Sequence, residues 1–124
     1  MRKVLIVDDE PNILLSLEFL MKKQGYLVFI ARDGKEALDI IQAQNPEVII
    51  LDVMMPEMDG YEVCQFVKNH PRHHESKVVF LSAKTKDTEI AQGYAAGADL
   101  YITKPFSTRH LTKQVGAFFE EVGK

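Results

Sequence analysis

Four short hydrophobic runs in this 124-residue chain each stop at a polar side chain that can do chemistry. These side chains are Asp8 and Asp9 after residues 4–7, Asp52 after 48–51, Ser82 after 78–81, and Lys104 after 100–103. Carboxylate oxygens are the ligands that Mg²⁺ prefers, and an aspartyl carboxylate can act as a nucleophile in phosphoryl transfer. If these side chains meet, they predict Mg²⁺-assisted phosphoryl chemistry.

Each of these side chains would have a distinct role in phosphoryl chemistry. Three carboxylates placed close together repel one another, so they need a bound cation or shifted pKa values. A Mg²⁺ ion held by Asp9 and Asp52 would leave one Asp52 oxygen free to attack phosphorus. The transferred group spreads its negative charge over its oxygens, which cations and hydrogen-bond donors must match. Lys104 supplies an ammonium group, Ser82 a hydroxyl group, and Mg²⁺ the third contact.

The elements that must position these residues follow from the hydrophobic pattern. Short β-branched runs bounded by polar residues are typical of strands buried on both faces of a parallel sheet. We expect strands at residues 4–7, 27–31, 48–51, 78–81 and 100–103. Helical patterns separate them: from Pro11 to the stop at Gln24-Gly25, from Asp33-Gly34 to Asn45-Pro46, from 61 to 69, from 85 to 96, and from the cap Ser107 to about 121.

This alternation of strands and helices predicts an α/β fold of the (βα)₅ type, in one domain that covers residues 1–124. Right-handed crossovers place helices on both faces of a doubly wound parallel sheet. We expect the strand order 2-1-3-4-5, in which the winding reverses between strands 1 and 3, and ligands bind at such a switch point. The topology therefore predicts that Asp8, Asp9 and Asp52 meet there.

The composition excludes several classes of protein. A net charge of −3 without a basic cluster argues against a nucleic-acid-binding surface. One cysteine, Cys64, excludes an internal disulfide, and we expect it in the core. No apolar stretch approaches about 20 residues, and the amino terminus lacks the apolar region of a signal peptide. We therefore expect a cytoplasmic protein that binds neither membranes nor nucleic acid directly.

Each candidate site residue also has a purely structural interpretation. Asp8 or Asp9 could cap the first helix, and Ser82 could be a cap or turn residue. Lys104 could be the structural partner of an ion pair. Acidic, hydroxyl and ammonium groups occur together at the carboxyl ends of different predicted strands. This joint occurrence favours a functional site over the separate structural interpretations.

Several motifs around these residues resemble the receiver domain of two-component response regulators. They span the chain: Val-Asp-Asp-Glu (Val7–Glu10), Leu-Asp-Val-Met-Met-Pro-Glu-Met-Asp-Gly (Leu51–Gly60), Leu-Ser-Ala-Lys (Leu81–Lys84), Ala-Gly-Ala-Asp (Ala96–Asp99) and Tyr-Ile-Thr-Lys-Pro-Phe (Tyr101–Phe106). The resemblance implies a flavodoxin-like fold. It also implies a phosphorylation-dependent signalling switch, with no enzymatic activity beyond Mg²⁺-dependent self-phosphorylation and self-dephosphorylation.

The resemblance assigns roles to individual residues. It implies that Asp52 accepts a phosphoryl group from the phosphohistidine of a sensor histidine kinase or a histidine phosphotransfer protein. Asp9, Asp52 and the backbone carbonyl of Met54 would bind Mg²⁺ directly, and Asp8 would act through water. Ser82 and Lys104 would bind the phosphoryl oxygens, and the Lys104–Pro105 peptide bond would be cis.

The same resemblance implies a switch. Ser82 would move toward the phosphoryl group, and Tyr101 would rotate from solvent into the space that Ser82 leaves. The face formed by helix 4, strand 5 and helix 5 would contact a downstream protein or a tethered output domain. Met54 and Lys84 flank the path of attacking water, and neither orients water as a carboxylate or amide would. We therefore expect slow self-dephosphorylation.

Other features separate this chain from DNA-binding members of the family. Leu100 replaces a second acidic residue, and Thr112, Lys113 and Gln114 replace the arginine-bearing pattern used for symmetric dimers. These differences argue against that dimer mode. The chain stops after the fifth predicted helix, so we expect no output domain in it, and either a stand-alone receiver or a piece of a longer regulator fits.

Two other functions compete with the signalling interpretation. A small phosphohydrolase with an aspartyl nucleophile normally has a second acid two residues later, where this chain has Met54. An interaction module that no longer takes phosphate would be expected to have lost an acidic residue or Lys104, and neither loss is seen. His70, His73 and His74 suggest a metal or phosphohistidine site, but a solvated loop is the simpler expectation.

Overall fold

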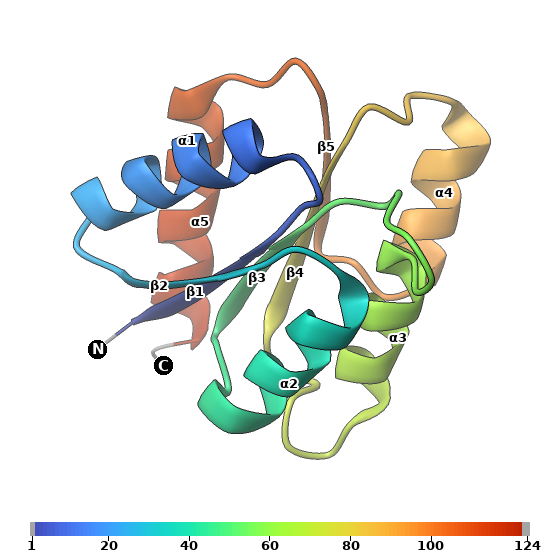
Figure 1. Ribbon diagram of the computed structural model, residues 1–124, viewed down its shortest axis with the longest axis horizontal. Coiled ribbons are helices and arrows are strands. Elements are labelled where there is room, and N and C mark those ends of the chain that lie inside the picture. The colour runs from blue at the N-terminus through green and yellow to red at the C-terminus, as the bar shows by residue number, and fades with distance from the viewer. Residues whose placement is uncertain (1, 123–124) are drawn as a thin grey trace.

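The computed structural model describes residues 2–122, in which five strands alternate with five helices. Their bounds are β1 Lys3–Val7, α1 Pro11–Lys23, β2 Leu27–Ala31, α2 Gly34–Gln44, β3 Val48–Leu51, α3 Gly60–Asn69, β4 Lys77–Ser82, α4 Asp87–Ala95, β5 Leu100–Thr103 and α5 Thr108–Val122. All strand pairs are parallel and the strand order is β2-β1-β3-β4-β5 (Figure 1). The predicted flavodoxin-like fold and strand order are confirmed.

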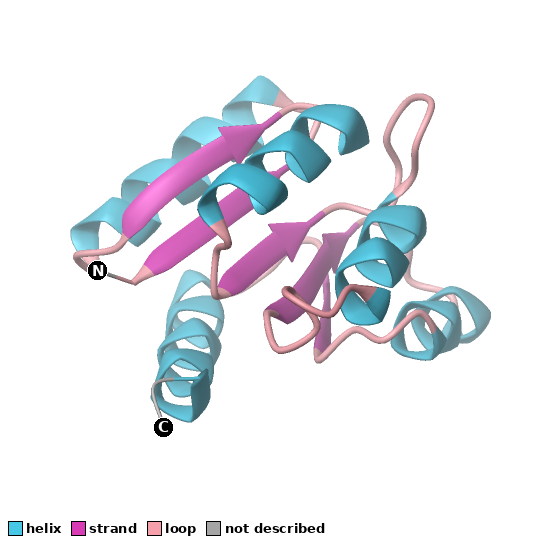
Figure 2. Cartoon of the chain, turned by 90° about the horizontal axis from the view of Figure 1, so that it is seen from below, coloured by secondary structure: helices cyan, strands magenta, loops and turns pink. Residues whose placement is uncertain are grey.

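Helices cover both faces of the sheet, as the crossover rule requires (Figure 2). Successive strand side chains point to opposite faces. In β1, Val4 and Ile6 pack with α1 and α5, whereas Leu5 and Val7 pack with α2 and α3. Every residue of β3 is buried, which explains why its sequence is an unbroken hydrophobic run.

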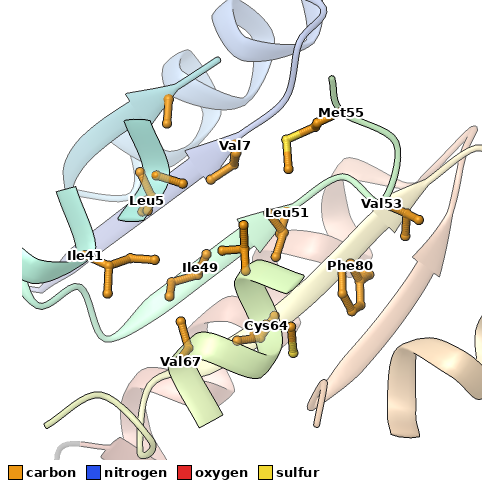
Figure 3. Close-up of a cluster of buried hydrophobic side chains, with 14 of the residues drawn as sticks. Leu5, Val7, Ile41, Ile49, Leu51, Val53, Met55, Cys64, Val67 and Phe80 are labelled. Atoms are coloured by element: carbon orange, nitrogen blue, oxygen red, sulfur yellow. The ribbon is translucent and has the colours of Figure 1, made fainter. Parts of the chain in front are cut away.

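Cys64 lies in the core cluster between the sheet and α3, together with Leu51, Val67 and Phe80 (Figure 3). Its thiol is fully buried, and its Sγ lies 3.5 Å from the backbone oxygen of Ala96. Burial raises the pKa of Cys64 to about 11, so the thiol is uncharged near neutral pH. The cysteine is a core residue, as predicted.

Hydrogen bonds near the first turn fix the starts of α4 and α5, and they correct one prediction. The Ser107 hydroxyl accepts a hydrogen bond from the His110 N–H at 3.2 Å, as expected of the cap of α5. The fourth helix was expected to begin at Thr85, but α4 begins at Asp87. The Glu89 carboxylate accepts a hydrogen bond from the Lys86 N–H at 3.1 Å, and this interaction fixes the start of the helix there.

The connection between α3 and β4 differs from the solvated loop that we expected, because His73 is only 1% exposed. Its Nδ1 lies 2.8 Å from the amide oxygen of Asn45, the residue that ends α2 in a left-handed conformation. Burial lowers the pKa of His73, and the neighbouring His70 and Arg72 lower it further. His73 is therefore a neutral residue that joins two loops at the amino-terminal edge of the sheet.

Within residues 2–122, no helix combines the length and the apolar character that crossing a membrane requires.

Candidate functional site

The carboxyl ends of four strands form the candidate site, because the hydrogen-bonded ladder extends just beyond the strands. The Asp52 N–H donates to the Val7 carbonyl at 3.0 Å, and the Lys104 N–H donates to the Ser82 carbonyl at 2.8 Å. Oxygens of Asp8, Asp9 and Asp52 all lie within 4.8 Å of one another. The meeting of these residues that the topology predicted is confirmed.

An open pocket of about 390 Å³ lies at this edge of the sheet. It is lined by Asp9, Glu10, Asp52, Met54, Ser82, Ala83, Lys84 and Lys104. Sequence analysis gave Glu10 no role, although the residue directly follows the acidic pair. Its carboxylate adds a further negative charge near Lys104.

Asp8 is buried, and both of its oxygens already have partners. Oδ1 accepts a hydrogen bond from the Glu10 N–H at 2.9 Å, and Oδ2 lies 3.0 Å from the Lys104 ammonium nitrogen. Neither Asp8 nor Asp9 is the N-cap of α1, since Glu10 occupies that position without a side-chain capping bond. The capping interpretation of the acidic pair is therefore wrong.

Asp52 is buried, with 7% of its surface exposed, but only one of its oxygens is closely held. Oδ1 accepts a hydrogen bond from the Val53 N–H at 2.8 Å, whereas Oδ2 lies 3.9 Å from Nζ of Lys104. Burial raises the pKa of Asp52, Lys104 lowers it, and the negative charge of Asp8 raises it, with a net upward shift. Backbone hydrogen bonds from Val53 and Met54 also lower this pKa. The pocket thus contains a carboxylate oxygen, Oδ2, whose charge faces the Lys104 ammonium at 3.9 Å.

Lys104 balances the charge of the acidic cluster. Its Nζ lies 3.0 Å from Asp8 and 3.9 Å from Asp52, so the ion pair considered as its structural role does form. Burial by itself lowers the pKa of Lys104, but the hydrogen bond to Asp8 and the charges of Asp52 and Glu10 outweigh it and raise the pKa. The ammonium group therefore stays charged, and its position in the pocket allows it to bind an incoming anion as well.

Ser82 is the last residue of β4, and its hydroxyl is almost completely buried. Ser82 Oγ accepts a hydrogen bond from the Lys84 N–H at 3.1 Å. Tyr101 points inward rather than toward solvent, and its hydroxyl donates to the Lys84 carbonyl at 2.8 Å. Burial raises the pKa of Tyr101. The backbone of Lys84 thus connects the serine hydroxyl to the buried aromatic ring.

The remaining predicted residues lie around the pocket. Met54 is 56% exposed at its edge, and the Lys84 ammonium lies 3.7 Å from the Glu89 carboxylate. The Lys104–Pro105 peptide bond is cis. Asp8, Tyr101 and Pro105 do not line the pocket. The Tyr101 ring packs against Phe80 with ring centroids 5.8 Å apart.

The donor set fits Mg²⁺. Asp9 is exposed, and its carboxylate has no hydrogen-bond or ion-pair partner within the described chain, while Asp52 Oδ2 lies in the pocket 3.9 Å from Lys104. Mg²⁺ is bound by one or two carboxylates, waters and phosphate oxygens rather than by a closed protein cage. The open acidic pocket, with Asp9 and Asp52 at its edge, suits this mode of binding.

Comparison with known proteins gives a consistent result. A family model described as the response regulator receiver domain matches residues 4–116. The chemotaxis protein CheY4 of Vibrio cholerae is 34% identical with a TM-score of 0.88, and the match covers 95% of this chain and 98% of that chain. The DrrB receiver domain activated by BeF3 is 34% identical with a TM-score of 0.89, over 97% of this chain and 98% of that chain.

A third similar structure is the signal receiver domain of a signal transduction histidine kinase from Syntrophus aciditrophicus. It is 32% identical with a TM-score of 0.92, over 98% of this chain and 92% of that chain. The TM-scores agree with the strand order described above. The chain therefore belongs to the family of response regulator receiver domains, the signalling switches of two-component systems.

Proposed function

We propose that this receiver domain accepts a phosphoryl group on Asp52 from the phosphohistidine of a sensor histidine kinase or a histidine phosphotransfer protein. The observation that supports this most is the Asp52 carboxylate, which lines the open pocket with its Oδ2 atom 3.9 Å from the Lys104 ammonium. In the proposed reaction, Oδ2 bonds to phosphorus while the phosphorus–nitrogen bond of the donor breaks. The electron pair of the broken bond returns to the imidazole.

Mg²⁺ would supply positive charge to the phosphoryl oxygens in this reaction. We assign its direct binding to Asp9, Asp52 and the backbone carbonyl of Met54. Asp8 is assigned a role through water, which agrees with the engagement of both its oxygens by Glu10 and Lys104. Asp8 holds Lys104 at the pocket until a phosphoryl group competes for the ammonium.

The proposed switch follows from the added negative charge. Phosphorylation places new acceptor oxygens beside Lys104 and Ser82, and charge-assisted hydrogen bonds to them would draw both groups inward. Because the Lys84 N–H is bonded to Ser82 and the Lys84 carbonyl to Tyr101, a movement of Ser82 changes the contacts of the ring. Beryllium fluoride, the activator named for the similar DrrB receiver domain, is the corresponding probe for this chain.

We propose that the face of α4, β5 and α5 transmits the signal to a downstream protein or a tethered output domain. This face includes β5, which carries Tyr101, and α4, which carries Tyr94 with 45% of its surface exposed. A rearrangement of the ring would therefore change the surface presented to a partner. Neither direct contact with nucleic acid nor membrane binding is part of this proposal.

Phosphorylation can be tested by intact mass after incubation with Mg²⁺ and acetyl phosphate. We expect the wild-type protein to gain one phosphoryl mass, and we expect no gain for Asp52→Ala or when Mg²⁺ is removed. Rapid consumption of the donor without an adduct would point to a phosphatase instead. The absence of both an adduct and donor consumption would indicate an interaction module that takes no phosphate.

A second expected result concerns the lifetime of the phosphorylated protein. Met54 and Lys84 line the pocket, and neither side chain orients water well, so we expect a phosphoryl half-life of minutes or longer. Met54→Asp places a carboxylate at the edge of the pocket and should shorten the half-life at least about tenfold, since general bases typically contribute more than this. Met54→Leu is the matched control and should behave as wild type. A wild-type half-life of seconds would contradict this expectation.

A further inference from the structure

Gly93 of α4 lies directly against the inward ring of Tyr101. A Cβ atom built at Gly93 would lie 2.7 Å from Cδ2 of Tyr101, 3.0 Å from its Cε2, and 3.3 Å from Cδ2 of Phe80. Glycine weakens a helix relative to alanine. Gly93 lies within α4 and has no positive φ that would require glycine. The feature of this position that excludes a side chain is the neighbouring ring.

The inward orientation of Tyr101 is held at three points. Its hydroxyl donates to the Lys84 carbonyl, its ring packs on Phe80, and the edge of the ring lies against Gly93 of α4. The Tyr101 backbone N–H in turn donates to the hydroxyl of Tyr94 on α4 at 3.1 Å. The ring thus touches the loop after β4, the core, and α4 at Gly93. A change in its orientation alters contacts at both Lys84 and α4.

A methyl group at residue 93 would be accommodated by movement of the tyrosine ring. Phe80 is fully buried and cannot retreat, whereas β5 lies at the edge of the sheet and a Tyr101 ring can rotate from there toward solvent. A buried group that cannot move forces its movable neighbour to yield. Substitution at Gly93 should therefore displace Tyr101 while leaving the rest of the core in place.

We propose that Gly93 is a positioning residue of the switch. Because glycine has no side chain, the Tyr101 ring can occupy the space beside residue 93. The size of residue 93 then sets the balance between inward and outward Tyr101. This inference rests on the proposed function, because inward Tyr101 is the orientation that phosphorylation of Asp52 would favour. By linkage, a variant that disfavours the inward ring binds a phosphoryl analogue more weakly.

The test compares Gly93→Ala with Gly116→Ala. Both changes replace a helical glycine, but a Cβ at Gly116 would meet only the Tyr26 hydroxyl oxygen, at an ordinary contact distance of 3.9 Å. NMR spectra of ring-labelled tyrosine, assigned with Tyr101→Phe, report the ring without any phosphoryl donor. We expect Gly93→Ala to move the Tyr101 signal toward that of a solvent-exposed tyrosine, and Gly116→Ala to leave it unchanged.

The second measurement is the affinity for beryllium fluoride with Mg²⁺. We expect Gly93→Ala to weaken binding at least about tenfold, and to have no further effect when Tyr101→Ala is already present. An unchanged Tyr101 signal in Gly93→Ala would overturn the inference. So would an equal loss of beryllium fluoride affinity when Gly93→Ala is introduced into the wild type and into Tyr101→Ala. If the wild type bound no beryllium fluoride, the proposed function would fail, and the ring signal would still decide whether Gly93 admits Tyr101.

Folding of the variants gives an independent result. If Gly93→Ala does not fold, the combination with Tyr101→Ala should restore folding, as monitored by circular dichroism, because the clash lies with that ring. Failure of both variants to fold would overturn the proposed role.

Discussion

Asp52→Asn is expected to make the metal-free domain more stable and to remove most of its affinity for Mg²⁺. Burial and the charge of Asp8 raise the pKa of Asp52 in the folded state, despite the opposing effect of Lys104, so the ionised carboxylate costs folding free energy at neutral pH. Asparagine removes this charge and keeps the oxygen that accepts the Val53 N–H. We expect a gain on the order of 1 kcal/mol, or about 4 °C in melting temperature.

The pH dependence of this gain has a definite sign. A raised pKa means that the folded state holds its proton more tightly than the unfolded chain does. The wild type therefore loses stability relative to Asp52→Asn as the pH rises from the ordinary value of 3.8 through the raised pKa of the folded state. The difference should be absent well below pH 3.8 and constant at neutral pH.

Thermal unfolding with EDTA and with Mg²⁺ measures both effects. Mg²⁺ should raise the melting temperature of the wild type but not that of Asp52→Asn, because loss of a direct ligand should weaken binding by about 100-fold or more. Asp39→Asn is the matched control, since it removes one negative charge from an exposed position on α2. Equal Mg²⁺ shifts in wild type and Asp52→Asn would exclude Asp52 as a ligand.

Gly60→Ala should give the largest loss of stability among the changes at the site. A Cβ at Gly60 would overlap the backbone oxygen of Asp52 and would lie 3.0 Å from Cε1 of Phe80. Neither a backbone carbonyl nor a fully buried ring can retreat cheaply, so we expect a loss of about 3 kcal/mol. The backbone of Asp52 would shift with it, and phosphorylation should slow in the molecules that still fold.

Urea unfolding of Gly60→Ala gives the stability, and the acetyl phosphate assay at low temperature gives the reactivity. Gly116→Ala serves here too, because its added methyl group meets no backbone atom within 4 Å. A wild-type urea midpoint for Gly60→Ala would show that the β3–α3 connection adjusts around the methyl group, contrary to our expectation.

Much of the fold can be predicted from the sequence, because the strands and helix starts depend on residues that are close together in the chain. The run Val48–Leu51 predicts a fully buried strand, and the predicted helix starts at Asp33 and Ser107 each accept a hydrogen bond from a backbone N–H three residues later. The burial of His73 has no such local signal. It depends on a left-handed Asn45 that lies 28 residues earlier in the sequence.

Some features of the candidate site likewise follow from the sequence, whereas others depend on the packed structure. That the three aspartates would meet follows from strand order alone, since each stands at the carboxyl end of a strand. The preference of Lys104 for Asp8 over Asp52 depends on differences of less than an ångström, which no sequence pattern encodes. The pairing of Gly93 with Tyr101 likewise becomes visible only when α4 is packed against β5.

The hydrogen bond between the Tyr101 N–H and the Tyr94 hydroxyl has a consequence for self-association. β5 is an edge strand, and the unpaired N–H groups of an edge can template the addition of a strand from another molecule. Tyr94 occupies one of these donors with a side chain from the neighbouring helix. The Tyr94 hydroxyl thus satisfies a donor at the open edge of the sheet, which lowers the tendency of that edge to pair with a strand of another molecule.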